Sequence, residues 1–400
     1  MNLTFQEVYP PRGCMAKDVL LVRGGALGPN SGIGGAHHSL ALSLQGGEID
    51  GWRSSKTSEY AVRQRSTPFF RLYQRWFGHP RRVRKLLKKD HEYSILHVTD
   101  QEQAHLIPED CSVPVVVTVH DLFHLFPEVL DIAGEFIEVG EQNPPWYRRR
   151  DLKKLRQGLA RADLLVCDSQ ATLAACQRHF PKVNAVCVPL GIDVTSFLRG
   201  DSVPVGPAAH FEKHCHLLIV GSHDPRKRLA FVCQVLGGLD ETVKHNIRIH
   251  HVGHGECPYG GPAAIDYAEK YHVPNWTGYG GKLSSQSLME LRHACEALLF
   301  PSASEGFGYP PLEAMATGTP VVCSDLPSHN ELMPEHSCVD PADIDAWREA
   351  IQSVYANWES RTKGDTTHVW PAPMKGLIEF ASRYDQRHFC RRMGEVYDSL

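Results

Sequence analysis

Short apolar segments alternate with longer amphipathic segments along both halves of the chain. In the first half, runs rich in Val, Ile and Leu predict buried strands at 18–25, 94–100, 113–121, 162–169 and 184–191, with helical patterns at 148–161 and 170–180. Strands that alternate with helices predict parallel sheets built from βαβ units. The first half therefore reads as one doubly wound α/β domain.

The alternation stops at a segment rich in Gly, Pro and Ser and then begins again. The second half has predicted strands at 216–222, 247–253, 275–279, 296–302 and 319–325, and predicted helices at 227–238, 284–294 and 343–356. We therefore predict two Rossmann-like domains that face each other across a cleft. The expected divisions are an N-terminal domain at 1–194, a linker at 195–213, a C-terminal domain at 214–379 and a final amphipathic helix at 380–400. Ligands of open α/β sheets bind at the carboxyl ends of the strands, so the loops there should line the cleft.

Composition sets limits on this picture. The 400 residues are 42% hydrophobic and 22% charged, which is enough for two cores, and the net charge of −4 argues against a general nucleic-acid binder. No apolar run is long enough for a transmembrane helix, and the N-terminus lacks a secretory pattern, so we expect a cytoplasmic protein. The 12 cysteines form no CxxC pair and the 23 histidines form no HExxH pair, so we expect reduced thiols and no metal site.

The segment 301–320, PSASEGFGYPPLEAMATGTP, carries the strongest chemical signal. A predicted strand ends at Pro301, a helix is expected to begin at Pro311, and Gly318 is suited to end it. The N-terminus of a helix that faces a cleft attracts anions. Glu305 in the loop and Glu313 in the expected first helical turn would flank that anion. Carboxylates bind hydroxyl protons and repel phosphate, so this arrangement favours a phosphorylated sugar or a nucleotide as the ligand.

The same segment resembles a known family. EGFGYPPLE fits the E-x7-E signature of retaining glycosyltransferases of the GT-B fold, family 4. Three further stretches are similar to segments of that family: LLIVGSHDPRKRLAFVCQVL to its donor-phosphate loop, VVVTVHDLFHLFPE to its cleft-lining histidine segment, and NSGIGGAHHSLALSL to its Gly-rich first loop. The resemblance extends over residues 18–355.

This resemblance implies roles for particular residues. Glu305 would contact hydroxyls of the donor sugar, Glu313 the nucleotide ribose, and Lys227 with Arg226 the donor diphosphate. The implied catalytic residues are His120, Glu305 and Lys227. The implied donor-binding residues are Gly34, Gly35, Ser222, Arg226, Lys227, Glu305, Gly306, Phe307, Gly308, Tyr309, Leu312 and Glu313. Ser222 departs from the family, which often has an arginine there. The resemblance also implies that the final helix crosses back to the N-terminal domain.

The implied reaction is the transfer of a hexose, with retention, from a nucleotide-sugar to a hydroxyl of a glycan or a lipid-linked acceptor. No metal and no cofactor are implied, because the nucleotide-sugar is a substrate. The segments look most like mannosyltransferases of surface-polysaccharide assembly, so GDP-mannose is the leading donor, followed by UDP-glucose and UDP-N-acetylglucosamine. A sugar-nucleotide epimerase, a phosphorylase and a catalytically silent nucleotide-sugar binding protein remain as alternatives.

Two short motifs have competing interpretations. SGIGGAHH follows a strand and precedes a helix, as a dinucleotide fingerprint does, but it lacks the G-x-G-x-x-G frame, so a glycine turn beside the donor or acceptor is favoured. Asp343 and Asp345 superficially match a metal-binding DxD. They lie at a predicted helix start, which favours helix capping.

A basic block stands out at 63–89, with ten Lys and Arg residues, no acid and five aromatic residues. Basic and aromatic residues on amphipathic helices favour an anionic membrane surface, each charge contributing about 1 kcal/mol. The alternatives are a solvated helix with a buried aromatic face and a clamp for a soluble anionic acceptor. The expected membrane or acceptor contacts are Arg71, Arg75, Trp76, Arg81, Arg82, Arg84 and Lys85, which would place the protein at the inner face of the cell membrane.

Overall fold

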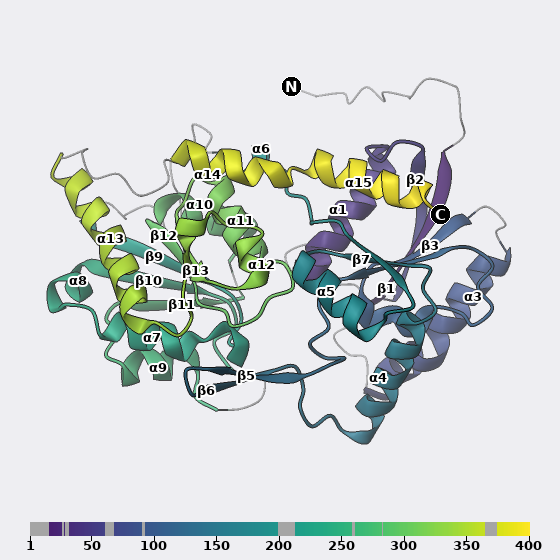
Figure 1. Ribbon diagram of the computed structural model, residues 1–400, viewed down its shortest axis with the longest axis horizontal. Coiled ribbons are helices and arrows are strands. Elements are labelled where there is room, and N and C mark those ends of the chain that lie inside the picture. Colours follow the sequence, from purple (N-terminus) through teal and green to yellow (C-terminus); the bar gives the residue numbers. More distant parts are fainter. Residues whose placement is uncertain are drawn as a thin grey trace.

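The computed structural model describes residues 16–25, 28, 32–60, 68–89, 93–198, 213–257, 261–281, 283–364 and 374–400. Within them the chain forms two lobes, each with a six-stranded sheet whose neighbouring strands pair in parallel (Figure 1). Most of the expected linker at 195–213 lies outside the described residues, which include only 195–198 and 213 of it. The prediction of two Rossmann-like domains is confirmed.

The N-terminal sheet has the order β2-β1-β3-β4-β7-β8. Its strands are Trp52–Tyr60 (β2), Lys17–Gly25 (β1), Tyr93–Val98 (β3), Val115–Val119 (β4), Leu164–Cys167 (β7) and Asn184–Cys187 (β8). The central strands are apolar on both faces, as expected of parallel strands covered by helices. The helices of this lobe are Gly32–Gly46 (α1), Pro68–Tyr73 (α2), His79–Lys89 (α3), Trp146–Leu159 (α4) and Gln170–His179 (α5), with η1 at Gln74–Gly78 and η2 at Gln101–Leu106.

The C-terminal sheet has the order β11-β10-β9-β12-β13-β14. Its strands are Trp276–Gly280 (β11), Ile247–Val252 (β10), Cys215–Val220 (β9), Ala297–Phe300 (β12), Val321–Ser324 (β13) and Cys338–Val339 (β14). The helices are Val194–Phe197 (α6), Leu229–Gly237 (α7), Glu241–Asn246 (α8), Ala264–Lys270 (α9), Ser285–Ala294 (α10), Tyr309–Ala316 (α11), Pro327–Asn330 (α12) and Ile344–Thr362 (α13), with the short turns η4 at Pro225–Lys227 and η5 at Glu335–Ser337. From β9 the strands that follow in sequence are added first on one side (β10, β11) and then on the other (β12, β13, β14). The boundary between β9 and β12 is therefore a topological switch point.

The end of the chain passes from the C-terminal lobe to the N-terminal lobe (Figure 1). Its elements are Met374–Ala381 (α14), Ser382–Tyr384 (η6) and Gln386–Asp398 (α15), so the last helix begins six residues later than the expected position 380. Tyr397 lies 1% exposed against the N-terminal sheet, and its hydroxyl is 2.7 Å from Nδ1 of His97 in β3. The Trp52 indole donates to Asp398. α15 therefore packs on the N-terminal sheet and joins the two lobes.

An unexpected hairpin reaches from the N-terminal lobe to the C-terminal lobe (Figure 1). It consists of Glu128–Ile132 (β5) and Glu135–Val139 (β6), paired antiparallel. Ile137 and Val139 pack on Ala303, in the loop after β12. Glu135 forms an ion pair of 2.6 Å with Arg228, directly after η4. The hairpin thus touches both of the C-terminal loops that the sequence assigned to the donor.

The first aspartate of the DxD-like pair caps a helix. Asp343 is the N-cap of α13, and its side chain accepts hydrogen bonds from the backbone N–H groups of Asp345 and Ala346. This is the capping geometry that the sequence favoured. Among the described residues, no group of three or more His, Cys, Asp and Glu side chains is placed to hold a metal ion.

Candidate active site

The candidate site lies at the switch point of the C-terminal sheet. β9 leads through Gly221 into η4, and β12 leads into the loop 301–308, so both loops meet at the same edge of the sheet. A cleft of about 840 Å³ opens beside them between the two lobes. Its lining includes Gly35, Ser222, His254, Arg292, Tyr309 and Glu313. A cavity of this size and position is typical of a site for a small organic ligand.

Glu305 lies at the centre of a group of charges that comes from both loops. Its carboxylate accepts hydrogen bonds from the Lys227 ammonium and, at 2.8 Å, from Nη1 of Arg226. Arg226 also donates to the carbonyl oxygen of Ser304. The Glu305 side chain is only 8% exposed. The residues assigned to the donor sugar and to its diphosphate are therefore in direct contact in this structure.

These contacts fix the charge state of Glu305. Burial alone would raise the pKa of its carboxyl group, but Arg226 and Lys227 outweigh burial and hold the pKa well below its usual range. Burial lowers the pKa of Lys227, and Glu305 opposes that shift. The carboxylate is thus ionised and already neutralised by the two cations that the sequence assigned to the diphosphate.

Gly306 brings the two lobes together. Its carbonyl oxygen accepts hydrogen bonds from the hydroxyls of Ser169 (2.6 Å) and Thr172 (3.4 Å), at the start of α5. A Cβ atom at position 306 would lie 2.0 Å from the backbone oxygen of His120. Only glycine allows this approach. The resemblance placed Gly306 among the donor-binding residues, whereas here it makes a close approach between the lobes.

His120 is held by acceptors at both ring nitrogens. Nδ1 is 2.6 Å from Asp168, and Nε2 is 3.1 Å from the carbonyl oxygen of Thr99. Burial raises the pKa of Asp168 and His120 opposes that shift; with Asp168 ionised, both ring nitrogens donate and the ring is protonated. Burial opposes that charge, but the Asp168 carboxylate outweighs burial and raises the pKa of His120 to about 9. The ring is 9% exposed and does not line the cleft described above, so the catalytic role that the resemblance implies for His120 stays a prediction.

The helix of the E-x7-E segment begins earlier than expected. α11 begins at Tyr309, not Pro311, after Gly308 with a φ of +116°. Pro310 and Pro311 lack an N–H, so Tyr309 supplies the only backbone donor of its first three positions. The helix N-terminus is thus a weaker anion site than the sequence suggested. Glu313 consequently lies in the second turn instead of the first.

The end of α11 follows the expectation. Gly318 has a φ of +79°. Its N–H bonds the carbonyl oxygen of Met315, and the N–H of Thr319 bonds that of Ala314. This is a Schellman motif, in which glycine is the residue that takes the left-handed conformation without strain. The motif therefore ends α11 where the sequence predicted.

The remaining donor-binding predictions divide between the cleft and the core. Gly35 and Ser222 line the cleft, whereas Gly34 is buried within α1. The side chains of Phe307 and Leu312 are 6% and 0% exposed and belong to the hydrophobic core. These two side chains therefore support the loop from behind, and any contact they make with a ligand in this arrangement must come from their backbone. Asn30 and Ser31 of the glycine-rich loop lie outside the described residues.

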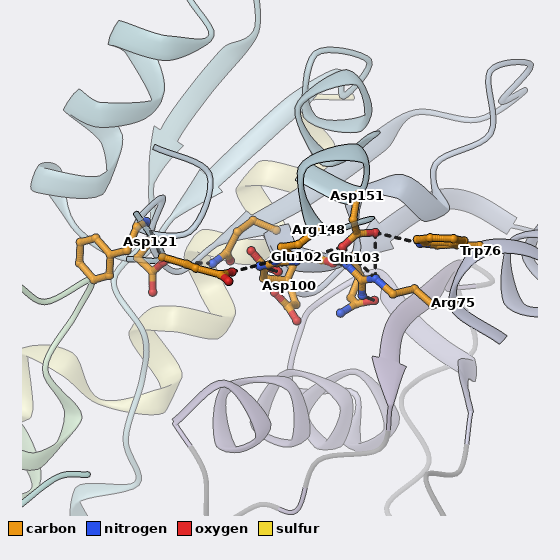
Figure 2. Close-up of polar contacts among 11 residues, drawn as sticks. Arg75, Trp76, Asp100, Glu102, Gln103, Asp121, Arg148 and Asp151 are labelled. Atoms are coloured by element: carbon orange, nitrogen blue, oxygen red, sulfur yellow. Dashed lines mark hydrogen bonds and ion pairs between the residues drawn. The ribbon is translucent and has the colours of Figure 1, made fainter. Parts of the chain in front are cut away.

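Arg75 and Trp76 of the basic block are engaged inside the N-terminal lobe (Figure 2). Arg75 forms a two-pronged ion pair with Asp151 of α4, with a shortest distance of 2.7 Å, and Nε1 of Trp76 is 3.4 Å from the same carboxylate. Arg148 joins Asp151 to Glu102 in η2. The Arg75 side chain is only 17% exposed. It ties η1 to α4 and η2 instead of projecting from the surface as the sequence suggested.

The other predicted contacts of the block are on the surface. Residues 63–67 lie outside the description, but α2 and α3 expose Arg71, Arg81, Arg82, Arg84 and Lys85. Phe69 beside them is 85% exposed. The structure adds α4 to this face: Trp146 is 69% exposed, and Arg150 and Lys154 of the same helix lie over the Trp76 ring. The part of the chain that the structure describes has no helix long and apolar enough to span a bilayer.

Two residues of the site were not found from the sequence. Asp168 holds His120 from 48 residues away, and Arg292 of α10 forms an ion pair with Glu313. Asp168 follows an apolar strand, a position that could have marked it as a cleft residue. Arg292 lies within an ordinary amphipathic helix, so the sequence holds no sign that its side chain turns inward.

Comparison with known proteins agrees with this geometry. Residues 47–196 match the family described as Glycosyltransferase Family 4, and residues 207–365 match Glycosyl transferases group 1. The O-antigen chain mannosyltransferase RfbU of Salmonella typhimurium is 40% identical over 74 residues, 18% of this chain and 21% of that protein. The O-antigen chain mannosyltransferase B of Escherichia coli is 27% identical over 199 residues, 48% of this chain and 52% of that protein.

Solved structures share the fold over nearly the whole chain. The Anabaena protein HepE, in complex with UDP and glucose, superposes with a TM-score of 0.65 at 16% identity, covering 96% of this chain and 100% of that one. Two Rossmann-like lobes around a cleft, with the E-x7-E loop at the switch point, define a protein of the GT-B class. The chain belongs to the GT-B glycosyltransferases of family 4. The curated matches above span about half or less of those relatives' lengths, so they identify the family and leave the substrates open.

Proposed function

We propose that this protein transfers mannose from GDP-mannose, with retention and without a metal ion, to a hydroxyl of a glycan or lipid-linked acceptor in cell-surface polysaccharide assembly. One observation carries the proposal: Glu305 lies between Lys227 and Arg226 at the switch point, beside a cleft large enough for a nucleotide-sugar. The O-antigen mannosyltransferases among the relatives support mannose as the sugar.

The charges suggest how the donor would be handled. A diphosphate entering the cleft competes with Glu305 for Lys227 and Arg226. The cations then stabilise the charge that develops on the leaving diphosphate. Glu305, released from part of its neutralisation, accepts a hydroxyl of the sugar and orients it. Because no negative group needs to attack the sugar, the acceptor can approach from the side on which the diphosphate leaves.

The donor identity is tested directly by nucleotide release. Purified protein is incubated separately with GDP-mannose, UDP-glucose and UDP-N-acetylglucosamine, with and without a lipid extract as acceptor. We expect release from GDP-mannose alone. Release from a UDP-sugar instead would show that the protein is a transferase with a different donor. Binding of a nucleotide with no release under any condition would favour the silent binding protein, and formation of an isomerised nucleotide-sugar would favour the epimerase.

We further propose that the surface of α2, α3 and α4 holds the protein at an anionic membrane, where a lipid-linked acceptor would be found. Exposed aromatic residues beside Lys and Arg are the combination that such surfaces favour. Arg81, Arg84 and Lys85 carry exposed charges of α3. The ion pair of Arg75 with Asp151 holds α4 against η1, so the two parts of this surface are kept together.

Reversal of the charge at Arg81, Arg84 and Lys85 should weaken binding to vesicles that contain anionic lipid by roughly 100-fold or more, because each charge contributes about 1 kcal/mol. Vesicle co-sedimentation at two salt concentrations measures this. The matched control reverses Lys363, Lys375 and Arg391, which are exposed cations of the C-terminal elements. Equal loss in both triple variants, or no binding by the native protein, would contradict a dedicated membrane surface.

A further inference from the structure

Arg292 and Glu313 form a partly buried ion pair in the wall of the cleft. Arg292 lies on α10 and Glu313 on α11, and Nη2 of Arg292 donates to Oε2 of Glu313. The arginine side chain is 6% exposed and the glutamate side chain 24% exposed. Both residues line the cleft. The glutamate is therefore presented to a ligand with one of its oxygens already engaged.

The arginine is incompletely satisfied. Its Nε atom is buried and has no hydrogen-bond partner among the described residues. The contact with Glu313 therefore leaves part of the donor capacity of this guanidinium unused. The guanidinium carbon also lies over the Phe197 ring, 5.9 Å from its centroid, and this ring supplies no conventional acceptor.

The backbone around the pair is fixed from two sides. The carbonyl oxygen of Arg292 accepts a hydrogen bond of 2.6 Å from the Thr319 hydroxyl. Thr319 itself belongs to the Schellman motif that ends α11. The end of α10 and the helix that carries Glu313 are thereby linked, so Arg292 and Glu313 lie on connected elements.

We propose that Arg292 is a positioning residue for the nucleotide, forming with Glu313 a clamp for the ribose hydroxyls. A hydroxyl is both a donor and an acceptor. It can donate to the free oxygen of Glu313 while it accepts from the guanidinium of Arg292, which also lines the cleft. The inference rests on the proposed function, because it requires a nucleotide in this cleft, and it adds a residue that the E-x7-E signature does not contain.

The test compares nucleotides with and without the ribose hydroxyls. Dissociation constants are measured by calorimetry for GDP and UDP and for their 2′,3′-dideoxy forms, with the native protein and with Arg292→Gln, Arg292→Lys and Glu313→Gln. We expect Arg292→Gln to weaken binding of the better ribonucleotide about 10- to 100-fold, the range of a charge-assisted hydrogen bond. The dideoxy form should bind the native protein weakly, and Arg292→Gln should weaken it no further. Arg292→Lys should recover part of the loss.

The controls separate this role from a structural one. Arg361→Gln removes an arginine from a surface ion pair with Glu296, outside the cleft, and should leave both nucleotides unaffected. Equal weakening of the ribonucleotide and its dideoxy form by Arg292→Gln would overturn the clamp. So would equal affinity of the native protein for the two forms, a result that does not depend on whether any variant folds. Should the native protein bind none of the four nucleotides, the proposed function fails and the clamp fails with it. If the native protein binds nucleotides but does not distinguish the ribose forms from the dideoxy forms, only the proposal of the clamp is contradicted.

Discussion

Replacement of Glu305 by glutamine is expected to lower turnover of the nucleotide-sugar about 100- to 1,000-fold, the range found when one preorganised polar group of an active site is removed. The substitution keeps the shape of the side chain and removes its charge. Because Lys227 and Arg226 then lose their protein counter-charge, the affinity for the free nucleoside diphosphate should stay the same or increase. A fall in kcat without a loss of nucleotide affinity is the expected signature.

The measurement pairs steady-state kinetics with calorimetric binding of the diphosphate. Glu395→Gln, at an exposed position of α15, is the matched control and should behave as the native protein. Lys227→Met should instead weaken diphosphate binding, about 10- to 100-fold, since a charged hydrogen bond to the phosphate is lost. A Glu305→Gln protein with nearly native kcat would contradict the role of this carboxylate. Isolation of a covalent glycosyl adduct at Glu305 would show that it attacks the sugar instead of orienting it.

Replacement of Asp168 by asparagine is expected to lower the free energy of unfolding by about 3–5 kcal/mol near pH 6.5, the range found when one partner of a buried ion pair is removed. The reason is that the protonated His120 ring is buried and depends on Asp168 for its counter-charge. Since proteins of this kind are stable by only about 5–15 kcal/mol, the loss should be conspicuous in urea unfolding.

The same ion pair predicts a pH dependence of stability. In the folded state burial lowers the pKa of His120, but the Asp168 carboxylate outweighs burial and raises the pKa from 6.5 to about 9. The native protein binds this proton more tightly than the unfolded chain does, so its stabilisation is complete below pH 6.5 and declines as the pH rises towards about 9. Unfolding free energies at several pH values across this window measure the decline.

Asp168→Asn and His120→Asn should both flatten this part of the pH profile. His245→Asn, which changes an exposed histidine at the end of α8, should preserve it. A native protein whose stability is constant or rises over the window would show that His120 is neutral in the folded state. The charge assigned to the ring from its two acceptors would then be wrong.

The elements that the sequence predicted well are those with an apolar, β-branched core. β4 and β9 were found because such runs signal buried parallel strands. β2 was missed because WRSSKTSEY is a polar edge strand that pairs with β1 alone. The hairpin of β5 and β6 was also missed. Its Ala133–Gly134 turn, with positive φ at both residues, is flanked by alternating polar and apolar residues, and this was the signal that could have revealed it.

The sequence identified individual site residues better than their partners. Glu305, Lys227 and Arg226 were singled out, and the structure brings them into contact. Asp168 and Arg292 were not singled out, because neither belongs to a motif and each meets its partner only through the fold. Arg75 was assigned to the surface from the charge of its neighbours, whereas Asp151, 76 residues away, draws it inside.

The sequence by itself therefore determined the alternation of strands and helices, the two doubly wound lobes and the loops that carry chemistry, because hydrophobic periodicity and turn residues act over a few neighbouring positions. The tertiary structure alone decided which charges meet. The order of strands brings the loops after β9 and β12 to one edge, and the closing of the lobes seats Gly306 against His120. These pairings depend on which strands are neighbours and how the lobes close, and no local pattern of residues encodes either.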